Sequence, residues 1–136
     1  MSTLSTSEYL LLFRGTDWHK GLSPEQIQTV VNDMKAWFDR LTEQGKLKAG
    51  KPLMPEGKIV SQKKGRVVAD GPFAESKEAV AGFFLLEVSS IDEAAEIAKD
   101  FPGLNYGALV EVRTVAPECS LAQVVGEKIA EQRASA

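Results

Sequence analysis

The residues 8–14 predict a β-strand with apolar side chains on both of its faces, and this feature limits the fold most. Side chains alternate between the two faces of a strand. One face carries Tyr9, Leu11 and Phe13, and the other carries Leu10 and Leu12. Such a strand needs cover on both sides, so we expect it in the centre of a sheet.

The next segment predicts an amphipathic helix. Ser23 offers an N-cap hydroxyl, Pro24 fits the first helical position, and Gln26 completes a capping box. Gly45 favours the left-handed conformation that ends a helix. The apolar residues between them follow the three-four spacing of one buried stripe: Ile27, Val30, Val31, Met34, Trp37, Phe38 and Leu41.

The remaining patterns complete an α+β layout. We expect strands at residues 47–53, 59–62, 66–69, 82–88 and 108–115, a second helix over residues 91–101 and a tail helix marked by Leu121, Val124, Val125 and Ile129. Ser90 and Glu93 form a second capping box before the second helix. This order predicts a ferredoxin-like antiparallel sheet with two helices on one face.

Two helices cover only one face of such a sheet, so we expect a second subunit on the other face and predict a homodimer. The apolar residues that we expect to exceed what the two helices can cover are Leu10, Leu12, Phe84, Leu86, Val110 and Val112.

The length of 136 residues indicates one domain. We expect a disordered leader at residues 1–7, the domain at residues 8–116 and a C-terminal helical tail at residues 117–136.

The charge distribution and the lengths of the apolar runs indicate which classes of partner this chain can bind. The net charge is −3, yet a segment with seven basic residues and Glu56 carries +6, so the rest carries −9: Lys46, Lys48, Lys51, Lys58, Lys63, Lys64 and Arg66. We interpret these as a solvated hairpin and expect no nucleic-acid partner, because the chain as a whole is acidic. No apolar run approaches the roughly 20 residues of a membrane span, so we expect no membrane partner.

The cysteine and histidine counts limit the chemistry. One cysteine, Cys119, forms no internal disulfide, and with the single histidine it provides no zinc set. We therefore expect no metal, no cofactor and a cytoplasmic location. Cys119 is interpreted as a packing residue.

The residues 70–78 (DGPFAESKE) combine a turn-forming triplet with an aromatic residue and acids. Asp70 has two interpretations: its carboxylate accepts backbone N–H groups in a tight turn, or it faces a ligand. Both stay open. Together with Gly82, Phe83 and Phe84, this segment resembles the signature of the DGPF subgroup of YCII-related proteins.

The resemblance runs from Tyr9 to Arg113. It implies a dimeric ferredoxin-like α/β barrel similar to muconolactone isomerases, and it implies no single reaction. Members of the wider family are thought to use a histidine and an aspartate in a pocket, with the histidine on the first helix, where this chain has Asp33. The resemblance also suggests a functional link to an extracytoplasmic-function sigma factor.

The catalytic candidates are therefore Asp70, His19 and Asp33. His19 follows the first strand, where an imidazole can act as a base near neutral pH, although a solvated histidine is the commoner case. Asp33, Asp70, Glu75 and Glu78 can also converge as paired acids, or the two glutamates can face water. The predicted ligand pocket comprises Asp70, Gly71, Pro72, Phe73, Phe83 and Trp18, whereas Trp37 is interpreted as core.

Two functions remain open at this point. We slightly favour a binding or regulatory accessory module for a small organic ligand, because the helix histidine is replaced. The alternative is a small lyase or isomerase in which Asp70 or His19 moves a proton on an organic acid or lactone.

Overall fold

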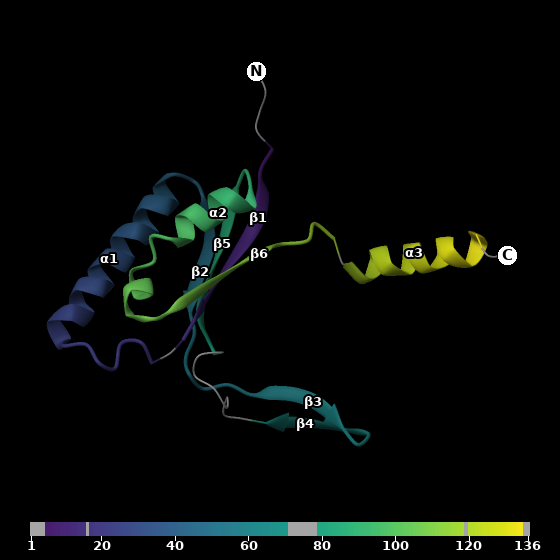
Figure 1. Ribbon diagram of the computed structural model, residues 1–136, viewed down its shortest axis with the longest axis horizontal. Helices are drawn as coiled ribbons and strands as arrows, with labels where there is room; N and C mark the ends of the chain where they lie inside the picture. The colour runs from purple at the N-terminus through teal and green to yellow at the C-terminus, as the bar shows by residue number, and fades with distance from the viewer. Residues whose placement is uncertain (1–4, 16, 71–78, 119, 135–136) are drawn as a thin grey trace.

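The computed structural model describes residues 5–15, 17–70, 79–118 and 120–134 (Figure 1). Its elements, in chain order, are β1 (Ser7–Arg14), α1 (Pro24–Glu43), β2 (Leu47–Pro52), β3 (Ile59–Lys63), β4 (Arg66–Asp70), β5 (Val80–Val88), α2 (Ile91–Ala98), a 3₁₀ helix (Pro102–Tyr106), β6 (Leu109–Thr114) and α3 (Ser120–Ala134). The predicted strands and helices are all present. The 3₁₀ helix was not predicted.

The main sheet has the strand order β2-β5-β1-β6, and all neighbouring strands are antiparallel. β1 is central, as its two apolar faces predicted. α1 and α2 pack on the same face, because Trp37 and Leu41 of one helix and Ile97 of the other belong to a single buried cluster with Leu11. This arrangement confirms the α+β class and is consistent with the ferredoxin-like fold.

The capping box predicted for α1 is confirmed. The Ser23 hydroxyl accepts the Gln26 N–H at 3.2 Å, and the Gln26 side-chain oxygen accepts the Ser23 N–H at 2.8 Å. Gly45 has a φ of 72°, which is the left-handed conformation expected after the helix. The start and the end of α1 are therefore set by local sequence.

The capping box predicted for α2 is only half correct. The Ser90 hydroxyl accepts the Glu93 N–H at 3.1 Å. The Glu93 carboxylate, however, accepts from Ser89, at 2.9 Å from its N–H and 2.8 Å from its hydroxyl. These bonds, together with Lys46 at 3.1 Å, lower the pKa of Glu93 below its ordinary value. Glu93 thus ties the start of α2 to the chain that precedes it.

The two faces of the sheet differ from the prediction. Phe84 and Leu86 were assigned to the uncovered face, but both are buried under the helices, and Val110 and Val112 pack against the same core. The pairing with β1 explains this correction, because Phe84 lies opposite the helix-facing Leu11. The residues that face away from the helices, half buried, are Leu10, Leu12, Phe83 and Leu85.

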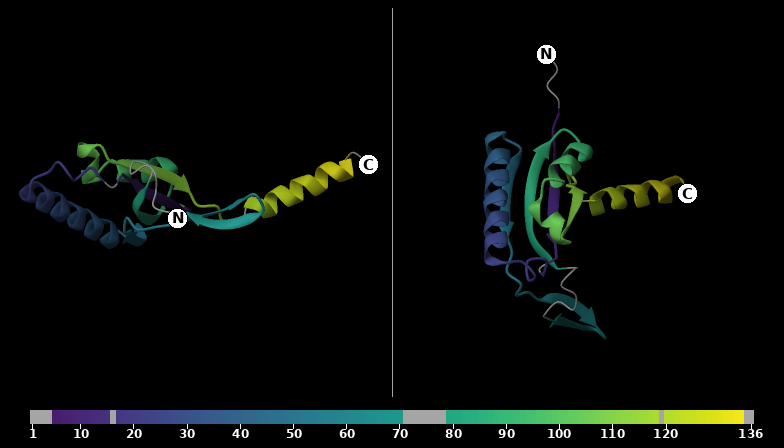
Figure 2. Two further views of the ribbon diagram at one scale, coloured as in Figure 1. Left: turned by 90° about the horizontal axis from the view of Figure 1, so that it is seen from below. Right: turned by 60° about the vertical axis from the view of Figure 1, so that its left-hand side comes forward.

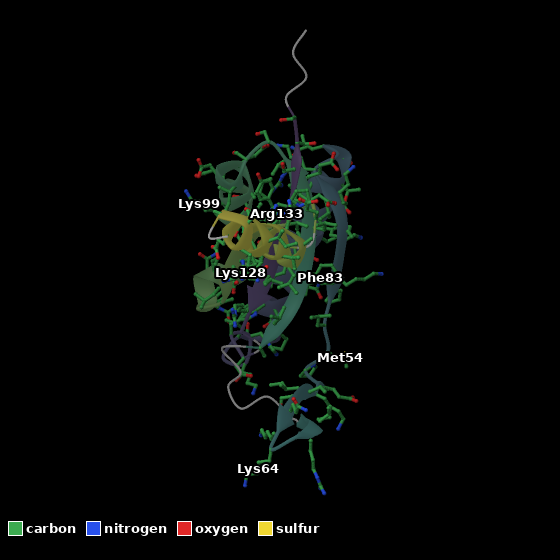
Figure 3. All side chains as sticks on the ribbon, turned by 90° about the vertical axis from the view of Figure 1, so that its right-hand side faces the viewer. Met54, Lys64, Phe83, Lys99, Lys128 and Arg133 are labelled. Carbon is green, nitrogen blue, oxygen red and sulfur yellow. The ribbon has the colours of Figure 1, made fainter. Side chains whose placement is uncertain are left out.

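Two segments extend beyond this body (Figure 2). β3 and β4 form a separate hairpin in which Val67 is 74% exposed, and Lys64 marks its tip in Figure 3. α3 projects from the end of β6, and within the described residues it makes no contact with another helix or strand. The apolar residues that predicted this helix are exposed: Leu121, Val124, Val125 and Ile129.

Candidate functional site

A cavity of about 610 Å³ lies between α1 and one end of the main sheet. Its walls come from five groups of residues that are far apart in the sequence: Phe13, Arg14, Gly15 and Trp18; Val30, Val31, Met34, Lys35 and Phe38; Gly50, Lys51 and Pro52; Ala81, Gly82 and Phe84; and Phe101. Nearly all of the lining surface is apolar. The volume is within the range of small-molecule sites, about 300–1,000 Å³.

The cavity exists because the apolar stripe of α1 is wider than its contact with the sheet. Trp37 and Leu41 are buried in the core, at 2% and 3% exposure. Val31 and Phe38 belong to the same stripe but are 53% and 38% exposed, and both line the cavity. The part of the stripe that does not reach the sheet therefore forms one wall.

Phe84 forms part of the opposite wall, and its position depends on Gly50. A Cβ atom at Gly50 would lie 2.7 Å from Cδ1 of Phe84, so only glycine leaves room for the ring. The ring then packs edge-on against Phe13, with 4.9 Å between ring centroids, and lies 5.1 Å from the Trp37 ring. Gly50 therefore shapes the cavity.

Further aromatic rings extend this wall. The ring centroid of Phe101 lies 4.7 Å from that of Phe13 and 6.3 Å from that of Trp18. The Trp18 indole also stacks on Tyr106 at 6.1 Å, which holds the loop after β1 over the body. Aromatic walls suit flat or apolar ligands.

The charged residues of the described lining are all basic: Arg14, Lys35 and Lys51. Arg14 is paired with Glu111, which also accepts a bond from Arg113 at 3.1 Å. Arg113 and Arg14 hold the pKa of Glu111 below its ordinary value. Lys35 and Lys51 form no ion pair with any carboxylate in the described part of the chain.

The structure separates the predicted site residues. Trp18 lines the cavity. Phe83 lies on the other face of the sheet, opposite Leu12, and is labelled in Figure 3. Its role as a ligand contact stays a prediction. Asp70 ends β4, and its side chain lies outside the described residues, as do Gly71, Pro72 and Phe73.

The other two catalytic candidates lie outside the cavity lining. His19 is exposed, and its ring stands edge-on to the Trp18 ring at 5.7 Å. Asp33 borders a shallow hollow of about 340 Å³ next to Trp37, Arg40 and Asp100. Neither residue lines the cavity, and the catalytic roles of both stay predictions.

The ends of the undescribed segment 71–78 can still be related to the cavity. The chain resumes at Ala79, whose carbonyl accepts the N–H of Gly15 at 3.1 Å, and Gly15 lines the cavity. The carbonyl of Ala81, another lining residue, accepts the Leu53 N–H at 2.8 Å. Ala79, the first described residue after this segment, therefore lies beside a residue of the cavity lining.

Sequence reasoning missed most of the cavity lining, including Lys35, Phe38 and Gly50 as ligand-facing residues. One signal was available, because seven apolar positions on α1 exceed what one buried face of a helix needs.

Across the ranges 5–15, 17–70, 79–118 and 120–134, His, Cys, Asp and Glu residues form no group of three that could hold a metal ion. The described helices include none with the length and apolar character of a membrane span.

Comparison with known proteins agrees with the signature motif. A family model described as the YCII-related domain matches residues 8–118. An uncharacterised protein of Rhizobium meliloti (strain 1021) is 35% identical over 86 residues, which cover 61% of this chain and 69% of that protein. The family model covers α1, α2 and the main sheet apart from Ser7, the first residue of β1. This chain therefore belongs to the YCII-related family.

Proposed function

We propose that this protein is a ligand-binding module that takes a small apolar or aromatic molecule into the cavity between α1 and the sheet. The observation that supports this most is the cavity itself, because about 610 Å³ of apolar space is retained next to a tightly packed core. The cavity opens to solvent, since Val31 and Phe38 in its wall are 53% and 38% exposed, so apolar surface is left in contact with water. A ligand with an apolar body would cover this surface and gain the free energy of its burial.

The alternative function, proton transfer by Asp70, His19 or Asp33, has no comparable support. A general acid or base must come within about 3 Å of the proton that it transfers. His19 and Asp33 lie outside the described cavity lining. We therefore prefer binding without turnover, while the role of Asp70, whose side chain lies outside the described residues, stays a prediction.

A titration with N-phenyl-1-naphthylamine, a neutral dye that fluoresces in apolar sites, tests this function. We expect saturable binding of one dye per chain. Val31→Trp should fill the cavity and weaken binding at least tenfold, because Val31 is half exposed and lines the space. Val125→Trp on α3 is the matched control and should bind as the parent protein does. Absence of saturable binding, or equal binding by Val31→Trp, would contradict the proposal.

We also propose that the protein is a homodimer in which the helix-free sheet faces of two copies meet. Leu10, Leu12, Phe83 and Leu85 give this face an apolar centre. Paired charges flank it, since Arg14 contacts Glu111 and Lys48 contacts Glu87 at 3.4 Å. A face with an apolar centre and mixed charges at its margin can pair with a copy of itself.

We infer a cytoplasmic location for this module. A single cysteine suits a reducing compartment because it forms no internal disulfide. The functional link to an extracytoplasmic-function sigma factor stays a prediction from the family resemblance.

A further inference from the structure

We propose that the ligand of this cavity carries one amino-acid unit, –NH–CHR–CO–, whose N–H and C=O groups pair with the backbone of Gly50 while its apolar side chain fills the cavity. This inference rests on the function proposed above and specifies the class of ligand.

The cavity lies at a free edge of the main sheet. β2 is the first strand in the order β2-β5-β1-β6, so within the described residues only one of its two edges is paired. α1 contacts β2 and lies next to it (Figure 1), and both contribute residues to the cavity lining. An edge strand directs alternate backbone N–H and C=O groups away from its sheet, where they can bind an added strand.

The register of β2 and β5 shows which residues direct their backbone groups to this edge. In an antiparallel ladder, pairs that are hydrogen-bonded to each other alternate with pairs that are not. The Leu53 N–H donates to the Ala81 carbonyl at 2.8 Å. The pair next to this bond, Pro52 and Gly82, is therefore of the second kind, and so is the pair formed by Gly50, two positions earlier. The N–H and C=O of Gly50 thus point away from β5.

The close approach of Phe84 agrees with this assignment. Side chains lie nearest to each other in pairs that are not hydrogen-bonded, and a Cβ atom at Gly50 would lie only 2.7 Å from Cδ1 of Phe84. Within the described residues, no hydrogen bond connects the Gly50 backbone to a group outside β5. Gly50 has only main-chain heavy atoms, so these atoms form its part of the cavity lining. A donor and an acceptor therefore lie beside the apolar space.

An amino-acid unit supplies the complementary groups in the required positions. In a hydrogen-bonded antiparallel pair, two opposite residues exchange both of their N–H···O=C bonds. A single secondary amide does not match this pattern, because its trans N–H and C=O point in opposite directions. An extended –NH–CHR–CO– unit has both groups on one side, so it can bond to the N–H and the C=O of Gly50 together.

The same pairing directs the side chain of this unit into the cavity. Opposite residues of an antiparallel pair place their side chains on the same face of the sheet. Gly50 lies opposite Phe84, which lines the cavity under α1, so the side chain of the bound unit lies on that face too. Gly50 has no side chain to occupy this space. The aromatic walls formed by Phe13, Phe84 and Phe101 then favour an aromatic side chain.

Titration of isotope-labelled protein with N-acetyl-L-phenylalanine methylamide, followed by NMR, tests the inference. On binding, the Gly50 N–H resonance should move downfield, because this group donates to the probe carbonyl. Its exchange with solvent should slow at least about tenfold. The Lys51 N–H is the internal control, since Lys51 and Phe83 form the next pair of the ladder and are hydrogen-bonded to each other within the sheet. Its exchange should not change.

The matched probe is the O-acetyl ester of L-phenyllactic acid methylamide, in which an oxygen atom replaces the N–H group. It keeps the phenyl ring and nearly the same shape but has no donor for the Gly50 C=O, so we expect about fivefold weaker binding. Acetyl-alanyl-phenylalanyl-alanine methylamide distinguishes two sources of the unit. Tighter binding than by the single-residue probe indicates a peptide segment, and equal binding indicates an N-acylated amino acid.

Val31→Trp, which fills the cavity, should weaken the binding of both matched probes, whereas Val125→Trp should bind them as the parent protein does. Three results would overturn the amino-acid unit while leaving the cavity function intact: binding of the neutral dye alone, equal affinity for the amide and the ester, or a Gly50 N–H that is already protected from exchange in the free protein. If neither the probes nor the dye binds, the cavity function fails as well.

Discussion

Replacing Gly50 by alanine should disturb the fold and the cavity together. The new Cβ atom would lie 2.7 Å from Cδ1 and 3.1 Å from Cε1 of Phe84, and 3.3 Å from the Phe83 carbonyl oxygen. Real Cβ atoms do not come within 3.0 Å of a neighbour, so the Phe84 ring must move. The movement is confined, because the rings of Phe13 and Trp37 lie 4.9 and 5.1 Å away.

Overpacking of this kind costs about 1–3 kcal/mol. Alanine also lowers the entropy of the unfolded chain, which returns about 0.5–1 kcal/mol. We therefore expect Gly50→Ala to lower the free energy of unfolding by about 1–2 kcal/mol. In urea this corresponds to a midpoint lowered by about 1 M, if the slope is about 1.5 kcal/mol per M.

The open side of the Phe84 ring faces the cavity, so the displaced ring should occupy part of that space. Dye binding should then weaken at least about fivefold, which corresponds to about 1 kcal/mol. The control is Gly21→Ala, because no atom lies within 4 Å of a Cβ at Gly21. If Gly50→Ala has the same urea midpoint and the same affinity for the dye as the parent protein, the packing described for Phe84 is wrong.

Three further outcomes are expected. Light scattering at micromolar concentration should show twice the mass of one chain, and a monomeric parent protein would refute the dimer. Leu12→Glu should give monomers. The control Met54→Glu, at a side chain that is 79% exposed, should leave the dimer intact. Glu93→Gln should cost about 1 kcal/mol at pH 7. The pKa of Glu93 is lowered from 4.5 in the folded state, so the Glu93 carboxylate contributes its full stabilisation above pH 4.5 and loses it as the pH falls through the folded-state pKa. Chemical denaturation should therefore show that the free energies of unfolding of the parent protein and the variant converge in acid. A difference that stays constant with pH would refute this. Removing the residues after Pro117 should weaken the dimer or the fold, and unchanged mass and melting temperature would show that α3 has neither role.

Most of the fold was predictable because its signals are local. The capping box at Ser23 and the positive φ of Gly45 depend on residues within a few positions of each end of α1. The alternation in β1 fixes which side chains share a face, whatever its neighbours are. The 3₁₀ helix was missed because Pro102 and Gly103 predict only an end to α2, and the turn that follows is completed by Gly107 at a φ of 93°.

The cavity was not predictable in the same way, because it depends on distances between elements. Val31 and Phe38, seven residues apart, lie together at one edge of the apolar stripe of α1, and Phe38 is about 100° around the helix from Trp37. In the folded chain Trp37 is 2% exposed, whereas Val31 is 53% exposed and borders open space. The spacing shows that the stripe is wide, but it does not show whether the edge of the stripe packs against the sheet or lines a pocket. The distinction requires the position of the helix relative to the sheet.

Phe83 and Phe84 show how one step of register changes the meaning of a motif. Both rings follow the signature segment, and sequence analysis placed Phe83 in the pocket and Phe84 on the uncovered face. β5 pairs with β1 so that Phe84 lies opposite Leu11 and Phe83 opposite Leu12. Adjacent residues of a strand point to opposite faces, so Phe84 borders the cavity within one chain, whereas Phe83 belongs to the face proposed for the second copy. One strand, β5, therefore contributes the Phe84 ring to the cavity and the Phe83 ring to the face proposed for the dimer.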